Sequence, residues 1–220
     1  TIYGAYVLRN YRSLMRYEGG IYDTESLSGR LKVDYKHIFA QFFAWMEVSA
    51  AKSGSDMTYG SRINEQGLSE MMMVHQPNSN SNIQVRGNLR KDFDWKKLSM
   101  ETTATWSHGN NQYLRQDVLT RYSSNAYAVD GKLSMEVSKW LELNYNIRWS
   151  RYRSNTEDGM SRISTEGCSN QLLLNTTLIG NKLWFTFNAS HQYDSQLDKK
   201  NNFFLSADLR YKMKKLDFTL

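Results

Sequence analysis

The amino-acid sequence predicts an all-β fold, an antiparallel up-and-down meander of about ten long strands. Three observations lead to this prediction. Polar and apolar residues alternate over long stretches, apolar residues lack the three-and-four spacing of a helix face, and short turns alternate with longer polar links. One proline and 13% aromatic residues exclude the compositions typical of disordered chains. Residues 1–220 are therefore interpreted as one β segment.

The N-terminal part of the chain alternates less regularly than the rest. Residues 1–20 contain several tyrosines without a clear parity, so we interpret them as a loop or a strand extension. Three later stretches alternate and predict strands: 30–35, 44–50 and 83–90.

The second half of the chain carries the clearest strands. From residue 141 to 150 every odd position is a large apolar or aromatic residue, and every even position is polar or charged. A period of two over ten residues predicts a strand with two unlike faces. Similar alternation occurs in these stretches: 98–106, 127–137, 183–189 and 203–212.

The links between the strands fall into two alternating classes. The short turns lie near residues 37–40, 92–96, 138–140, 179–182 and 212–215. The longer, polar links cover residues 52–82, 108–125, 153–167 and 194–201. Short turns on one side and long loops on the other are typical of outer-membrane β-barrels, whereas soluble sheets have strands of about five to six residues. The sequence therefore favours part of a transmembrane barrel, with outer-membrane lipid as a partner.

Tryptophans are spaced as expected for two interfacial girdles. Trp140 and Trp149 are nine positions apart, and Trp95 and Trp106 are eleven apart. A tilted strand crosses a bilayer in about 9–11 residues, and aromatic rings gather at both interfaces. The predicted interfacial aromatic residues are Trp95, Trp106, Trp140, Trp149 and Trp184.

Charged residues occupy the polar parity of the same strands. In a barrel this parity faces the lumen, where the side chains line a channel or contact a plug. The predicted lumen-facing residues are Arg86, Arg90, Glu101, Lys132, Glu136, Glu142, Arg148, Asp208 and Arg210.

Two segments resemble a known family. Residues 10–23 (NYRSLMRYEGGIYD), followed by the alternating meander, and residues 209–218 (LRYKMKKLDF) are similar to the C-terminal barrel of TonB-dependent receptors from the Gram-negative Bacteroidetes. The resemblance implies a 22-stranded outer-membrane transporter closed by an N-terminal plug. It also implies energised uptake of a large nutrient such as a glycan or siderophore, with TonB and a surface lipoprotein as partners. The plug, the TonB box and a closing aromatic strand are not found in this sequence, so we expect a fragment of a larger barrel.

The sequence carries no recognisable catalytic, cofactor-binding or metal-binding motif. The four histidines form no HxxxH or HExxH pair, Cys168 stands alone, and no phosphate-binding loop or nucleophile elbow occurs. We therefore expect no cofactor and no enzymatic activity. The net charge of +6 comes from scattered basic residues, which argues against nucleic acid as a partner.

Two alternatives remain open at this level. The first is a self-contained outer-membrane barrel of about ten strands, acting as an adhesin or as a protease with His108 and Asp117, or His191 and Asp194, near its rim. The second is a soluble β-domain that binds a partner, because an alternating pattern also suits a soluble sheet. The run Met71–Val74 offers soft apolar side chains to a ligand or, in the simpler interpretation, to neighbouring loops.

Overall fold

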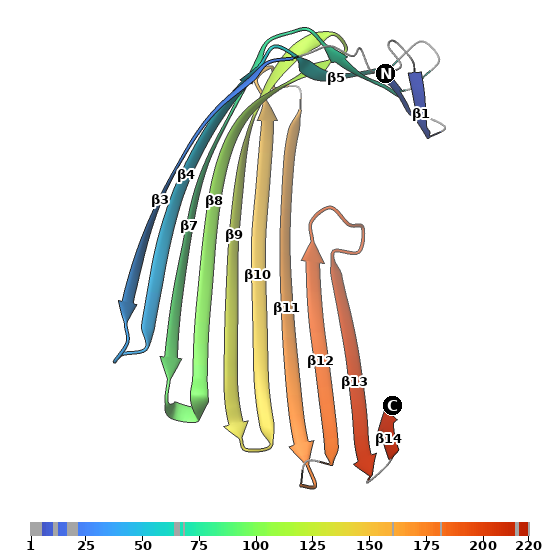
Figure 1. The fold of residues 1–220 in the computed structure, drawn as a ribbon. Helices are drawn as coiled ribbons and strands as arrows, with labels where there is room; N and C mark the ends of the chain where they lie inside the picture. Colours follow the sequence, from blue (N-terminus) through green and yellow to red (C-terminus); the bar gives the residue numbers. More distant parts are fainter. Residues whose placement is uncertain are drawn as a thin grey trace.

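The computed structural model describes residues 6–10, 13–16, 22–63, 67, 69–159, 161–180, 182–213 and 216–219. These residues form one 14-stranded sheet (Figure 1). The strands are β1 (Tyr6–Asn10), β2 (Ser13–Arg16), β3 (Thr24–His37), β4 (Phe42–Ser55), β5 (Thr58–Ile63), β6 (Ser69–Val74), β7 (Asn78–Phe93), β8 (Leu98–Arg115), β9 (Val118–Ser138), β10 (Leu141–Thr156), β11 (Arg162–Leu178), β12 (Leu183–Asp194), β13 (Asn201–Met213) and β14 (Leu216–Thr219), with a short 3-10 helix η1 (Trp95–Lys97). Within the described ranges, no helix is long and apolar enough to cross a membrane.

The main sheet is an antiparallel meander. Strand β3 pairs with β4, β4 with β7, and each strand from β7 to β14 pairs with the next one in the chain. Figure 1 shows these strands side by side as a curved wall. The predicted all-β, up-and-down arrangement of long strands is confirmed.

The wall ends in tight turns on the side where the sequence predicts them. Gln41, Lys96, Lys97 and Ile179 take positive φ values there, between 46° and 54°. Gly180 follows Ile179 with a φ of 59°, a conformation that glycine adopts without steric cost.

Two of the predicted long loops are largely strand, and this part of the prediction is wrong. Across residues 108–125, β8 and β9 stay paired as far as Arg115 and Val118. Only Gln116 and Asp117 form the turn, both at positive φ (49° and 63°), as a two-residue type I′ hairpin requires. Across residues 153–167, β10 continues to Thr156 and β11 starts at Arg162.

The link between β4 and β7 forms a branch at the upper end of the wall in Figure 1. Its hairpin β5–β6 pairs in parallel with the end of β8, through Gly60 opposite Leu114. Strand β2 adds in parallel to β6, and β1 pairs with β2. The remaining residues of the 1–20 stretch, and half of the segment 10–23 that carries the family resemblance, lie outside the described residues.

The buried apolar side chains of the described chain lie in the branch and at the end of β8 that pairs with it. Met57, Met73 and Leu114 retain 4–8% of their surface, and Thr58 retains 1%. The methionine run therefore packs within the branch, as the simpler interpretation expects. Elsewhere the sheet is a single layer, so most of its side chains stay exposed or half-buried.

Candidate functional site

The strand register divides the wall into two unlike faces. Residues directly opposite each other in an antiparallel pair point to the same side, and alternate residues point to opposite sides. The polar face, as we call it, carries the even-numbered residues of β3, β7, β9, β10, β12 and β13 and the odd-numbered residues of β4, β8 and β11. The other parity forms the apolar face.

All nine predicted lumen-facing residues lie on the polar face. Arg90 stands opposite Glu101, and Glu101 stands opposite Lys132 on the next strand. The other six follow in the same register: Arg86, Glu136, Glu142, Arg148, Asp208 and Arg210. The register brings these residues to one side of the wall.

Several charged groups on the polar face are paired with one another or with amides. Nε of Arg148 lies 3.6 Å from Oδ1 of Asp130, and Nζ of Lys97 lies 2.6 Å from Oε1 of Glu136. The amide of Asn88 donates a 2.8 Å hydrogen bond to Glu101. Such exposed pairs contribute little to stability individually, but together they make this face strongly hydrophilic.

The middle of the polar face is hollowed. A shallow hollow of about 300 Å³ spans β9 to β12. Its lining includes Asp130, Lys132, Asn146, Arg148, Gln171 and Gln192. Its donors and acceptors suit water or a polar molecule, and no apolar pocket of the kind that binds drug-like ligands is formed there.

An apolar band crosses the opposite face. On β10 it runs from Leu141 to Trp149, on β8 from Leu98 to Trp106, and on β13 from Phe203 to Tyr211. Nine residues extend about 27 Å along a strand, or about 20 Å across a bilayer at a tilt near 40°. This height is close to the roughly 25 Å band of membrane barrels.

The band is open to the surroundings. Leu31 is 67% exposed and Leu205 is 73% exposed. A soluble domain rarely exposes so large a continuous apolar surface.

Hydrogen-bonded polar groups mark the upper edge of the band. The indole Nε1 of Trp149 donates to Glu166 at 2.9 Å. A ring nitrogen of His108 lies 3.0 Å from Oδ1 of Asn125, and Nε2 of His191 lies 3.0 Å from Oδ1 of Asn201. Aromatic rings with satisfied polar atoms are suited to the boundary between lipid and water.

The five predicted interfacial tryptophans occupy three kinds of position. Trp106 and Trp149 lie at the upper edge of the apolar band. Trp95 and Trp140 lie in the tight turns at the opposite end. Trp184 differs because the register places it on the polar face, where the guanidinium of Arg210 lies 5.6 Å from its ring centroid.

The candidate rim pairs are not assembled into a catalytic site. Asp117 lies in the tip of the β8–β9 hairpin, nine residues along the chain from His108. The ring of His108 instead contacts the side chains of Asn125 and Asn110. His191 contacts Asn170 and Asn201 on the apolar face, whereas Asp194 has the opposite parity. In the described part of the chain, no cluster of three or more His, Cys, Asp or Glu residues could hold a metal ion.

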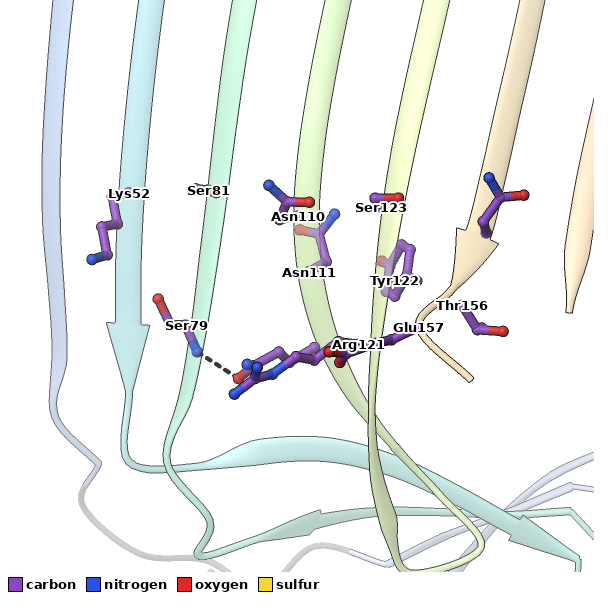
Figure 2. A pocket seen from close by; sticks show the side chains of 12 residues that line it. Lys52, Ser79, Ser81, Asn110, Asn111, Arg121, Tyr122, Ser123, Thr156 and Glu157 are labelled. Carbon is purple, nitrogen blue, oxygen red and sulfur yellow. Dashed lines mark hydrogen bonds between the residues drawn. The ribbon is translucent and has the colours of Figure 1, made fainter. Parts of the chain in front are cut away.

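A large hollow lies on the apolar face, above the band. Its volume is about 680 Å³, and it spans β4, β7, β8, β9 and β10 (Figure 2). The lining includes Lys52, Asn110, Gln112, Arg121, Asn155 and Glu157. From the sequence we assigned these positions to loops. Their signal in the sequence is that polar side chains occupy the apolar parity directly beyond the band.

Gln112 fixes one wall of this hollow. Its side-chain Oε1 accepts a 3.0 Å hydrogen bond from the backbone N–H of Ser79, drawn dashed in Figure 2. Its own backbone N–H donates at 3.0 Å to Oδ1 of Asn80. These bonds hold the extended part of β8 against the start of β7.

Comparisons with known proteins give a limited result. No protein-family model and no curated protein matches the chain. Among solved structures, the chain is similar to the ferric-catecholate import receptor Fiu from E. coli K12 in its open form, with a TM-score of 0.40 and 8% sequence identity. The match covers 90% of this chain and 45% of the receptor chain. At this TM-score the likeness carries no functional argument, so the functional inference depends on the two faces of the wall.

Proposed function

We propose that this chain is part of the wall of an outer-membrane β-barrel, and that the whole protein is a TonB-dependent transporter for a large nutrient. The observation that carries the proposal is the continuous, exposed apolar band about nine residues tall, which lies on one face of a wall whose other face is hydrophilic. In this arrangement the apolar band contacts lipid, and the polar face contacts water or a plug, so each face has surroundings of matching polarity.

The unpaired edge of the wall at β3 supports the proposal that the whole barrel has more strands than this chain. Strand β3 is 14 residues long and pairs, among the described residues, with β4 alone. A long unpaired edge leaves its N–H and C=O groups without partners, and inside a bilayer those groups need protein partners. We infer that further strands of the same barrel pair with β3.

The plug and the energy source of the proposed transporter are inferred from the family resemblance alone. In that family the plug fills the lumen, and TonB drives its rearrangement from the inner membrane. The paired charges around Arg148, Asp130 and Glu101 provide a hydrophilic surface for such a plug. The strand extensions and the β5–β6 branch would then lie outside the cell, where they could capture the nutrient alone or with a surface lipoprotein. No residue of this chain has a catalytic role in the proposal.

Fractionation of the source cells tests the proposal directly. An antibody against residues 22–63 is used to locate the intact polypeptide and to measure its size. We expect an outer-membrane band of about 80–110 kDa, the size of about 22 strands with a plug, and crosslinking of that band to TonB. An outer-membrane band only slightly heavier than 25.7 kDa would indicate the self-contained barrel, and a soluble band would refute the membrane assignment.

A further inference from the structure

Four arginines stand on the apolar face directly above the apolar band. They are Arg121 on β9, Arg151 and Arg153 on β10, and Arg162 on β11. The register gives all four the parity of the band. On β10 the alternation passes from Trp149 to Arg151 in one step, so the positive charge begins where the apolar surface ends.

Three of the four arginines, Arg121, Arg153 and Arg162, line two neighbouring hollows. Arg153 and Arg162 line a hollow of about 420 Å³ together with Asn155 and Ser164. They are diagonal neighbours, because Arg153 stands opposite Ser164 and Asn155 stands opposite Arg162. Asn155 also lines the larger hollow, which contains Arg121. The two hollows therefore adjoin at Asn155.

Few acidic groups offset this charge. Glu166 stands opposite Arg151, but its Oε1 accepts the indole N–H of Trp149. Glu157 lines the larger hollow. None of the four arginines has a carboxylate within 4.0 Å among the described residues. In addition, Nε of Arg151 is buried and has no hydrogen-bond partner there, which is a costly state for a charged donor.

We propose that this surface, the arginine ledge, binds the phosphate-bearing head group of a lipid whose acyl chains lie on the apolar band. Guanidinium groups bind phosphate through paired hydrogen bonds and are more weakly hydrated than ammonium groups. Cationic side chains at the head-group level of a membrane protein favour anionic lipids. A lipid is the occupant because the ledge is continuous with the band that its acyl chains would cover. This inference depends on the proposed membrane location.

Lipid binding to the intact natural polypeptide tests the ledge. The protein is reconstituted in phosphatidylcholine nanodiscs, and its affinity for diphosphorylated lipid A is compared with that for the monophosphorylated form. The test variant is Arg151→Gln/Arg153→Gln/Arg162→Gln. The matched control is Arg86→Gln/Arg90→Gln/Arg148→Gln on the polar face. Heat-resistant migration in gels confirms that each barrel is folded.

We expect the ledge variant to bind diphosphorylated lipid A at least about tenfold more weakly, while the control changes less than about twofold. Loss of one lipid phosphate should weaken binding to the unaltered protein and have little effect on the ledge variant. Equal affinity of the ledge variant and the unaltered protein for diphosphorylated lipid A would overturn the proposal. Full displacement of lipid A by millimolar inorganic phosphate would also overturn it, because it would indicate a site for soluble anions. If the polypeptide is absent from the membrane fraction, the proposed function fails first; if it is present and the variants bind equally, only the ledge fails.

Discussion

The indole Nε1 of Trp149 donates a 2.9 Å hydrogen bond to Oε1 of Glu166 on the neighbouring strand. Trp149 is the last ring of the apolar band on β10, and Glu166 stands opposite Arg151, the first residue beyond the band. The bond therefore crosses the boundary diagonally. It lets the ring remain part of the apolar band while its single polar atom is satisfied by a carboxylate that lies beyond the band.

This bond should contribute measurably to stability. Trp149→Phe keeps an aromatic ring but removes the donor, so we expect a loss of about 1–2 kcal/mol in the free energy of unfolding, because the acceptor is a carboxylate. Urea titration of the reconstituted protein measures it. Trp140→Phe, in an exposed turn, should change stability by less than about 0.5 kcal/mol. In a double-mutant cycle with Glu166→Gln, additive losses would show that the two side chains are not coupled.

Charge substitutions at adjacent residues should separate the two faces. Leu143 lies within the apolar band on β10, and Asn144 lies on the polar face. Leu143→Arg should cost about 2–4 kcal/mol if it places a guanidinium near the bilayer midplane, whereas Asn144→Arg should cost little. Leu209→Arg on β13 should behave like Leu143→Arg. Equal tolerance of arginine at residues 143 and 144 in outer-membrane assembly assays would contradict lipid contact at the apolar face.

The attachment of the branch to the wall depends on a glycine. A Cβ atom at Gly60 would lie 2.8 Å from Cβ of Leu114 and 3.2 Å from its carbonyl oxygen. Because Leu114 is buried and backbone cannot move aside cheaply, Gly60→Ala should separate β5 from β8 and cost about 1–3 kcal/mol. Faster proteolysis of the β4–β7 link would report this.

Gly29→Ala provides the matched control for this substitution. Gly29 also lies in a strand, but its Cβ would meet nothing within 4 Å, so we expect an unchanged cleavage rate. Equal cleavage of the two alanine variants would show that the contact between Gly60 and Leu114 does not hold the branch in place.

The sequence predicted the wall well where the two faces differ chemically. Residues 141–149 alternate because one parity is apolar and the other is polar, and the register agrees with that reading. The same reasoning failed above the band. Asn110, Asn111 and Gln112 are successive residues of β8, yet all three are polar, because both faces there meet polar surroundings. The strand therefore continues beyond the stretch of alternating residues from which a strand can be predicted.

The branch was beyond prediction for a different reason. The pairing of Gly60 with Leu114 joins residues 54 positions apart in parallel, and neither segment alternates clearly. The burial of Met73 beside this pairing follows from the three-dimensional arrangement rather than from any local pattern. Likewise, the arginine ledge is scattered over β9, β10 and β11 in the sequence and becomes a cluster only through strand register.

Tyr122 should make the stability of the extended β8–β9 hairpin sensitive to high pH. Its ring packs edge-on against Tyr113 at 5.4 Å between centroids, and it lies beyond the apolar band, which ends at Tyr127 on β9. Burial, followed by the neighbouring Tyr152 and Tyr113, raises the pKa of the Tyr122 phenol above its ordinary value near 10.

The folded protein therefore holds this proton to a higher pH than the unfolded chain does. Stability linked to Tyr122 is fully present below pH 10 and is lost as the pH rises above that value, because the unfolded chain releases the proton first. Melting temperatures measured from pH 8 to pH 11 should fall less steeply for Tyr122→Phe than for the unaltered protein. Tyr59→Phe, at an exposed ring, should leave the slope unchanged. Parallel curves for the unaltered protein and Tyr122→Phe would show that Tyr122 contributes nothing to the alkaline transition.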